Sequence, residues 1–183
     1  LAETTLQMGQ LLPSKQARFL TDLTGTVELS GQLEALNDLQ ESAEAEYLDL
    51  LRSNALNDFS CFVEFMTPDE PPAEHHEFMC RALEAFARRD PDYMRMALSM
   101  PPGHAKTKFC SRYFPAWYLG RFPNHRWLQA GHSQDFAENE FGKYVRDIIA
   151  DPKYAQVFEG VRLHPHSKAA GNWRLAQSRG GYV

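Results

Sequence analysis

A lysine and a threonine stand side by side where a glycine-containing loop meets a helical pattern. The segment from Ser99 to Lys108 reads SMPPGHAKTK, with Lys106 and Thr107 near its end. In loops of this kind backbone N–H groups point at phosphate oxygens, and the lysine ammonium offsets the charge of the β and γ phosphates. The threonine hydroxyl coordinates Mg²⁺. These residue types therefore predict a site for a nucleoside triphosphate with Mg²⁺.

The loop is expected to contribute backbone as well as side chains. Around Lys106 and Thr107, the predicted phosphate site comprises Pro102, Gly103, His104, Ala105 and Lys108. The usual pattern, G-x-x-x-x-G-K-[ST], has glycine where this chain has Met100 and Ala105. The methyl group of Ala105 crowds a backbone that should lie close to phosphate. The loop alone therefore leaves a chance match open, and its surroundings decide the interpretation.

Hydrophobic patterns place this loop between a strand and a helix. Alternation over residues 93–100 predicts a strand, and residues 106–118 predict a helix that Pro115 kinks and Gly120 ends. A second strand at 126–130 and an amphipathic helix from Ser133 to about residue 150 follow. Strand, loop and helix repeated in this order predict an α/β domain with parallel strands.

Further elements are predicted on both sides of this unit. Helices are expected at 32–53, after an N-cap at Asn57, and at 73–89. Asp151-Pro152 begins a short helix, residues 160–163 form a strand, and residues 164–183 are irregular. The three tryptophans, Trp117, Trp127 and Trp173, are expected in the core rather than as stacking platforms for bases.

Charge is distributed unevenly along the 183 residues, whose net charge is −5. Residues 1–50 carry a net −7, residues 51–93 a net −5 and residues 94–183 a net +7. The basic half could contact a polyanion through Arg112, Arg121, Arg126, Lys143, Arg146 and Lys153. Ordinary solvated helix faces explain the same residues equally well.

Composition excludes several other classes of protein. A hydrophobic fraction of 43% is that of a globular chain, and no apolar run is long enough to span a bilayer. Three widely spaced cysteines argue against a disulfide framework and fit a reducing cytoplasm. His164 and His166 lack a third ligand at a fixed spacing, and Ser133 with its neighbours suits a helix start better than a catalytic triad. We expect no signal peptide after Leu1, and the missing initiator Met indicates that the chain was trimmed or is an excerpt.

The run from Ala97 to Gly120 resembles the large subunit of tailed-phage terminases, the motors that package DNA. That family has a loop of the form PPRHGKS, followed by a helix with Ser-Arg-x-Phe-Pro-Ala-Trp, which residues 111–117 match. Further matches are Asn124-His125-Arg126, the turn at 131–135, the run 143–149, Phe62-Val63-Glu64 and His75-His76. The resemblance covers about residues 55–183, and residues 1–54 form a separate acidic helical segment.

The resemblance implies a P-loop ATPase of three-layer fold that couples ATP hydrolysis to translocation of double-stranded DNA. It implies ATP and Mg²⁺ as ligands, Lys106 as a catalytic residue, Thr107 as the Mg²⁺ ligand, and His75 and His76 near the adenine. It also implies a terminase small subunit and a portal protein as partners in the host cytoplasm, for a phage or prophage protein. No membrane partner is implied, and the DNA-binding residues stay unknown.

Two parts of the family pattern are missing from this sequence. Gly103 replaces the loop arginine, and the paired acids that hold Mg²⁺ and orient the attacking water in this family lie beyond Val183. The nuclease domain is also beyond Val183. We therefore expect an incomplete P-loop fold that binds nucleotide weakly and does not turn it over efficiently alone. A partner chain, a swapped element or self-association could supply the missing strands.

Two alternatives stay open from the sequence. In the first, the chain is a non-catalytic module whose acidic helices dock onto a partner and whose phosphate loop is a remnant. In the second, it belongs to another nucleic-acid-dependent P-loop motor, such as a helicase, whose later motifs would lie downstream.

Overall fold

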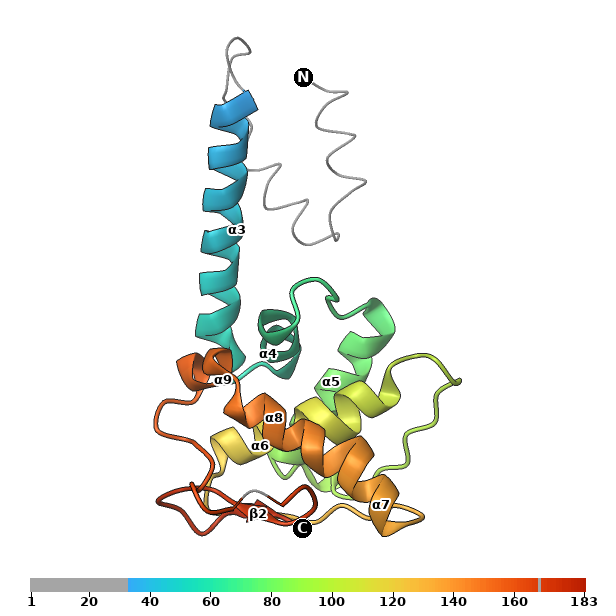
Figure 1. The fold of residues 1–183 in the computed structure, drawn as a ribbon. Helices are drawn as coiled ribbons and strands as arrows, with labels where there is room; N and C mark the ends of the chain where they lie inside the picture. The colour runs from blue at the N-terminus through green and yellow to red at the C-terminus, as the bar shows by residue number, and fades with distance from the viewer. Residues whose placement is uncertain (1–32, 168) are drawn as a thin grey trace. The chain divides into compact units, whose positions relative to one another are not determined.

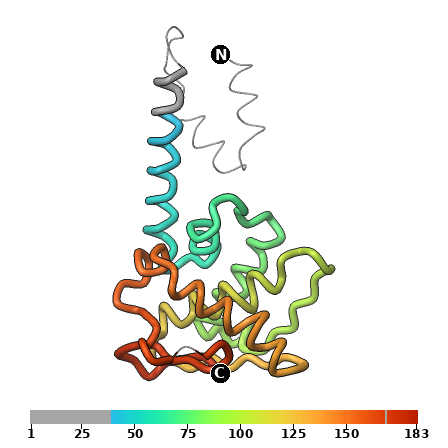
Figure 2. Tube along the Cα trace, viewed as in Figure 1, coloured from blue at the N-terminus to red at the C-terminus, as the bar shows by residue number. Residues whose placement is uncertain are grey.

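The computed structural model describes residues 33–167 and 169–183 (Figures 1 and 2). Residues 1–32, which belong to the predicted acidic segment, lie outside the described residues. The chain divides between Ser53 and Asn54 into two units. Helix α3 (Leu33–Ala55) begins in the first unit and ends two residues past this boundary, which confirms the helix predicted at 32–53.

Two helices precede the loop in the second unit. Helix α4 (Phe59–Met66) is buried along nearly all of its length, and helix α5 (Glu74–Ala87) buries one face. The predicted N-cap at Asn57 is wrong by one residue, because the Asp58 carboxylate accepts the Cys61 N–H at 2.8 Å. An ionised aspartate bound to a first-turn N–H also suits the positive end of the helix dipole.

The strand predicted at 93–100 does not form. A short 3₁₀ turn, η1 (Pro91–Tyr93), leads into an extended segment that has no ladder partner among the described residues. The expected alternation survives, since Met96, Leu98 and Met100 are half-buried and the residues between them are exposed. A strand needs a neighbour to satisfy its backbone. The short strands of this unit pair with one another instead.

The helices after the loop follow the prediction in position but not in winding. A π-helical segment, η2 (Thr107–Tyr113), runs straight into α6 (Phe114–Arg121). Pro115 lies in the first turn of α6 but inside a continuous helical run, so its missing N–H removes one hydrogen bond back to the preceding π segment. The predicted kink is therefore a change of helix type, in which the Phe114 N–H reaches back to the Phe109 carbonyl. Such widened turns often mark functional sites.

The amphipathic helix predicted from Ser133 is also divided by a π segment. It comprises α7 (Gln134–Ala137), η3 (Glu138–Gly142) and α8 (Lys143–Ala150). The Ser133 hydroxyl accepts the Phe136 N–H at 3.3 Å, as expected for an N-cap. Asp151 caps the short helix α9 (Pro152–Val157), which confirms the helix predicted at Asp151-Pro152.

Three two-residue strands form a small sheet at one edge of the unit (Figure 1). The strands are β1 (Arg126–Trp127), β2 (Trp173–Arg174) and β3 (Gly181–Tyr182), in the order β1-β3-β2. β3 pairs in parallel with β1 and antiparallel with β2. The strand predicted at 126–130 is therefore shorter. The one predicted at 160–163 is reduced to a bridge between Leu163 and Leu175, and residues 164–183 are not wholly irregular.

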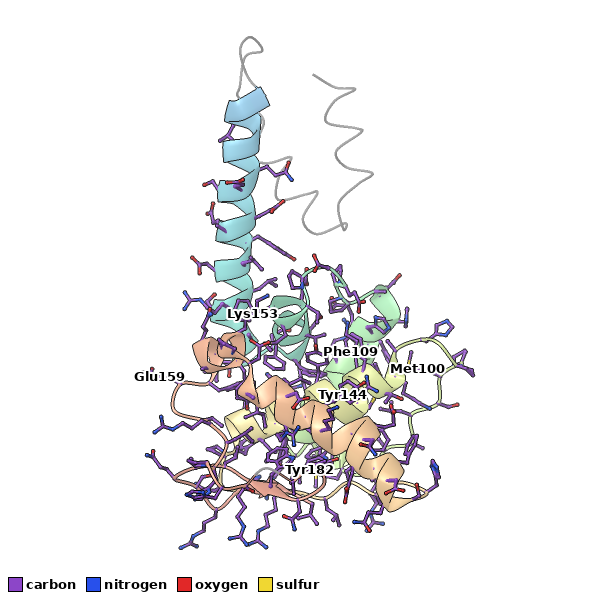
Figure 3. All side chains as sticks on the ribbon, viewed as in Figure 1. Met100, Phe109, Tyr144, Lys153, Glu159 and Tyr182 are labelled. Atoms are coloured by element: carbon purple, nitrogen blue, oxygen red, sulfur yellow. The ribbon has the colours of Figure 1, made fainter. Side chains whose placement is uncertain are left out.

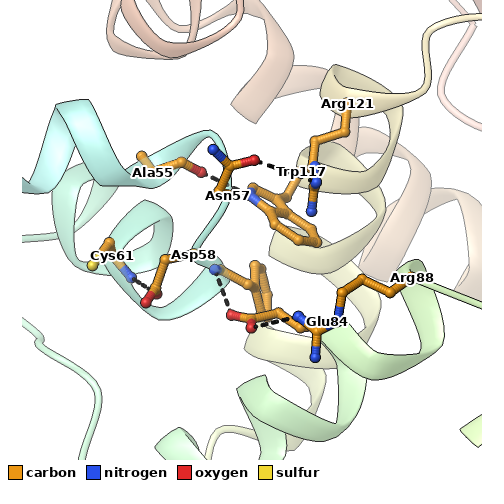
Figure 4. Close-up of polar contacts among 9 residues, drawn as sticks. Ala55, Asn57, Asp58, Cys61, Glu84, Arg88, Trp117 and Arg121 are labelled. Carbon is orange, nitrogen blue, oxygen red and sulfur yellow. Dashed lines mark hydrogen bonds and ion pairs between the residues drawn. The ribbon is translucent and has the colours of Figure 1, made fainter. Parts of the chain in front are cut away.

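An aromatic core joins the helices. The rings of Phe59 and Phe114 lie 5.3 Å apart and those of Phe59 and Trp117 lie 5.4 Å apart. The Trp117 indole N–H donates to the Ala55 carbonyl at 2.8 Å (Figure 4). The Phe59 N–H donates to the Glu84 carboxylate at 2.8 Å. Trp117 and Trp173 are fully buried, as predicted, whereas Trp127 is only half-buried.

The described residues form a helix-rich fold with one small mixed sheet, in coarse agreement with the α/β prediction. No helix in the described ranges is both long and apolar enough to cross a membrane.

Candidate functional site

Two left-handed residues shape the loop before Lys106. Gly103 has φ +82°, and Ala105 has φ +52°. An L-residue in this region brings its Cβ close to the following carbonyl oxygen, at a cost of about 1–2 kcal/mol. Ala105 is therefore strained, at the position where the usual phosphate-loop pattern has glycine. The ring of His104 lies over the turn, with Nδ1 3.1 Å from the Pro102 carbonyl oxygen.

The groups predicted to bind phosphate are open to solvent. Lys106 and Thr107 are exposed, and Lys106 forms no ion pair with any described residue. The backbone N–H groups of Gly103 and Ala105 donate no hydrogen bond within the described part of the chain. Unpaired donors of this kind, next to a cation and a hydroxyl at a helix start, can accept an anion and its metal ion.

His76 holds the loop against the N-terminus of α5. Its Nδ1 accepts the Ala73 N–H at 3.1 Å, so its Nε2 carries the proton and donates to the His104 carbonyl at 3.3 Å. Its ring stacks on Phe109, with centroids 4.4 Å apart and planes 24° from parallel. Phe109 lies inside the helical body, whereas Met100 lies on the segment leading to the loop (Figure 3).

Burial and then the nearby charge of His75 lower the pKa of His76, which favours the neutral ring that this geometry requires. The His75 and His76 rings lie 3.9 Å apart, and those of His75 and His104 lie 5.6 Å apart. The structure thus brings both predicted histidines to the loop. They form no metal site, because no described cluster of histidine, cysteine, aspartate or glutamate could hold an ion.

Lys108 is engaged elsewhere. Its ammonium lies 2.6 Å from a Glu70 carboxylate oxygen, and this hydrogen bond lowers the pKa of Glu70. Together with Arg112, Tyr113 and Tyr144 it lines a cavity of about 430 Å³. Lys108 was predicted to lie in the phosphate site, but the structure gives it a carboxylate partner in place of a free ammonium.

Most of the cations proposed for a polyanion surface are also occupied. Arg112 pairs with Glu140 at 2.9 Å and lies 3.6 Å from the centre of the Tyr144 ring. Arg146 pairs with Asp147, Arg121 lies over Trp117, and Lys153 lies near the Phe65 ring. Arg126 and Lys143 remain exposed. These six side chains therefore do not form one basic surface.

Sequence reasoning missed a cluster of polar residues beside the small sheet. Arg174, Ser178 and Arg179 line a cavity of about 700 Å³ with His164 and His166. Two signals could have found this cluster. Trp173 and Leu175 are apolar on either side of Arg174, which is typical of a strand with one exposed face, and residues 160–183 contain no acidic residue.

Comparison of the chain with family models, with curated proteins and with solved structures finds no match in any of the three.

Proposed function

We propose that the loop at residues 101–107 binds the phosphates of ATP with Mg²⁺. The observation that carries this proposal is the pair of left-handed residues, Gly103 and Ala105, followed at once by exposed Lys106 and Thr107. The left-handed turns leave the N–H groups of Gly103 and Ala105 without partners in the described chain. Lys106 would then offset phosphate charge, and the Thr107 hydroxyl would reach the metal.

The proposed parent protein is a terminase large subunit of a phage or prophage, acting in the host cytoplasm. Support comes from the set of motifs across residues 97–149 and not from the loop alone. In that setting the parent would couple ATP hydrolysis to DNA translocation, with a small subunit and a portal protein as partners. The P-loop fold of the parent is part of this proposal, and residues 1–183 would serve as its nucleotide-binding part.

Two observations favour the alternative of a remnant loop in a non-catalytic module. The segment before the loop makes no ladder with the described chain, and Ala105 carries the strain that glycine would relieve. Both features would weaken nucleotide binding without removing Lys106 or Thr107. A helicase-type motor would have the same loop, and motifs further along its sequence would distinguish it from a terminase.

Calorimetric titration of a non-hydrolysable ATP analogue with Mg²⁺ tests the loop. Lys106→Ala is expected to weaken binding by about tenfold or more, because a charge-assisted contact to phosphate contributes about 1.5–3 kcal/mol. Thr107→Ala is expected to abolish the dependence of affinity on Mg²⁺, and the matched variant Thr107→Ser, which keeps a hydroxyl, is expected to retain it. Equal binding by wild type and Lys106→Ala, or no binding at all, would overturn the proposal.

A further inference from the structure

A cavity beside the small sheet collects cations and polar groups and has no acidic residue among its described lining. Its volume is about 700 Å³. The polar residues around it are His164, His166, Ser167, Arg174, Ser178 and Arg179. A second cavity of about 380 Å³ shares Arg174, Ser178 and Arg179 with it and adds Arg126. The two cavities thus adjoin at these three residues, and together their linings hold Arg126, Arg174 and Arg179; we call this set the basic strip.

The backbone frame of the cavity is well defined. The His164 N–H donates to the Arg174 carbonyl at 2.9 Å, and the Ala176 N–H donates to the Arg162 carbonyl at 2.7 Å. The Ser167 hydroxyl accepts the Arg174 N–H at 2.9 Å. These bonds tie the segment after Leu163 to β2 and its extension, which lie side by side near the C-terminus in Figure 1.

Packing determines which way Arg174 points. Trp173 and Leu175 are buried, and the Trp173 ring stacks on Tyr182 with centroids 5.2 Å apart. Successive side chains of a strand point to opposite faces, so Arg174 lies on the exposed face. Neither Arg174 nor Arg179 forms an ion pair with any described residue.

A buried donor in the cavity wall lacks a partner. The Ser178 hydroxyl oxygen is buried and forms no hydrogen bond with the described chain. Buried hydroxyls are normally satisfied, because burying an unpaired polar group is unfavourable. His164 accepts the His166 N–H through Nδ1 at 3.3 Å, which leaves its Nε2 as a donor. Two guanidinium groups, a hydroxyl and an imidazole N–H therefore border one cavity as donors.

We infer that this cavity binds a phosphate group through Arg174, Arg179 and the Ser178 hydroxyl. Arginine forks match the oxygens of phosphate, and a neutral hydroxyl completes the coordination as a further donor. The continuation of the strip toward Arg126 favours a ligand with successive phosphates, which is the backbone of a polynucleotide. Free phosphate or a mononucleotide carries the same chemistry and would occupy a single position.

The site lies outside the proposed ATP loop and is independent of it. Lys106→Ala is therefore expected to lose nucleotide binding while keeping polynucleotide binding unchanged. A loop that fails to bind ATP leaves this inference standing, and a failure at this cavity leaves the ATP proposal standing.

The test uses the full chain and three variants. Arg174→Ala/Arg179→Ala removes two cations from the cavity, and Arg81→Ala/Arg95→Ala removes two exposed arginines elsewhere in the same unit. Ser178→Ala removes only the unpartnered hydroxyl and is expected to leave the urea unfolding midpoint unchanged or higher. Binding of a fluorescent DNA duplex and of its single strand is measured by anisotropy across a salt series, and inorganic phosphate is titrated by calorimetry.

The cavity double variant is expected to weaken duplex binding by about tenfold or more and to lower the salt slope by about 2. The control double variant is expected to change both much less, and Ser178→Ala to weaken binding at unchanged salt slope. Loss of phosphate binding without any DNA binding would assign the site to free phosphate. Equal behaviour of the cavity and control variants toward both probes, or binding of neither probe by the wild type, would overturn the inference.

Discussion

The loop around Lys106 and the helix that follows it use their cations in opposite ways. Lys106 is exposed and unpaired within the described chain, whereas Lys108, only two residues later, is bound to Glu70 at 2.6 Å. One turn further along, Arg112 pairs with Glu140 and lies over the Tyr144 ring. Lys108 and Arg112 thus link the helix to other elements through ion pairs, whereas Lys106 in the loop forms no ion pair with any described residue.

The same contrast holds for backbone and packing. The helical body rests on buried rings such as Phe59 and Trp117, which touch one another from several elements. The loop conformation depends on two left-handed residues and on the His76 bridge, and the Gly103 and Ala105 N–H groups donate no hydrogen bond within the described chain. Polar groups that are paired within the fold are not free to bind a ligand. The unpaired polar groups of an ordered loop are therefore the better candidates for binding.

The largest expected effect is a loss of stability when the aromatic core of the helices is disrupted. Trp117→Ala is expected to lower the free energy of unfolding by about 3–5 kcal/mol, because it leaves a cavity and strands the Ala55 carbonyl. Urea unfolding followed by circular dichroism measures this. Leu128→Ala serves as the control, since that side chain is 79% exposed and should change stability by less than about 0.5 kcal/mol. Similar losses in both would contradict the assigned core.

Alanine substitutions at two glycines compare the packed backbone of the sheet with the open backbone of the loop. Alanine at Gly181 would place its Cβ 2.5 Å from the Trp173 carbonyl oxygen, so Gly181→Ala is expected to cost about 1–3 kcal/mol. Gly103 has open space around it, and Gly103→Ala should cost only about 1 kcal/mol through its left-handed backbone. Urea midpoints in the reverse order would show that the loop is packed and the sheet is not.

A stabilising change tests the strain in the loop. Ala105→Gly is expected to raise the free energy of unfolding by about 1 kcal/mol, because glycine adopts a φ of +52° without the Cβ clash. Thermal unfolding detects a gain of this size in a small domain. Ala87→Gly, within helix α5, should destabilise instead. A loss of stability in Ala105→Gly would mean that Ala105 is not left-handed.

The smallest expected effect concerns the pH dependence of the His76 bridge. The pKa of His76 is lowered in the folded chain, so its contribution to stability is complete above the ordinary histidine value of about 6.5. It is lost as the pH falls through that value and on through the lowered pKa. His76→Gln keeps an acceptor for the Ala73 N–H but does not titrate. Wild type should therefore lose more stability than this variant between about pH 7.5 and pH 5, and parallel pH profiles would exclude the bridge.

Local chemistry made much of the fold predictable. Helix starts at Ser133 and Asp151 follow from capping residues beside amphipathic runs, and both form as predicted. The strand at 93–100 fails because its pattern specifies alternation and not a partner. The π segments have backbone hydrogen bonds between residues five apart instead of four, and no pattern of residue types in the sequence indicates them.

The candidate site also has parts that the sequence predicts and parts that it does not. Lys106 and Thr107 are recognisable because their chemistry depends on neighbours in sequence. His76 binds the loop through the His104 carbonyl, and its expected position near the adenine stays a prediction. The occupation of Lys108 by Glu70 was not predictable, because the two are separated by 38 positions. The cavity around Arg174 and Ser178 was missed because residues 164–183 were expected to be irregular, whereas a backbone hydrogen bond joins His164 to Arg174 and brings these loop residues together.

The most direct test of the account compares Lys106→Ala with Lys108→Ala in one calorimetric series with an ATP analogue and Mg²⁺. The two variants remove the same charge two residues apart. Lys106→Ala is expected to weaken binding by about tenfold or more, and Lys108→Ala by less than about threefold, because its partner is Glu70. Equal losses from both variants, or a larger loss from Lys108→Ala, would contradict the assignment of the free cation to the loop.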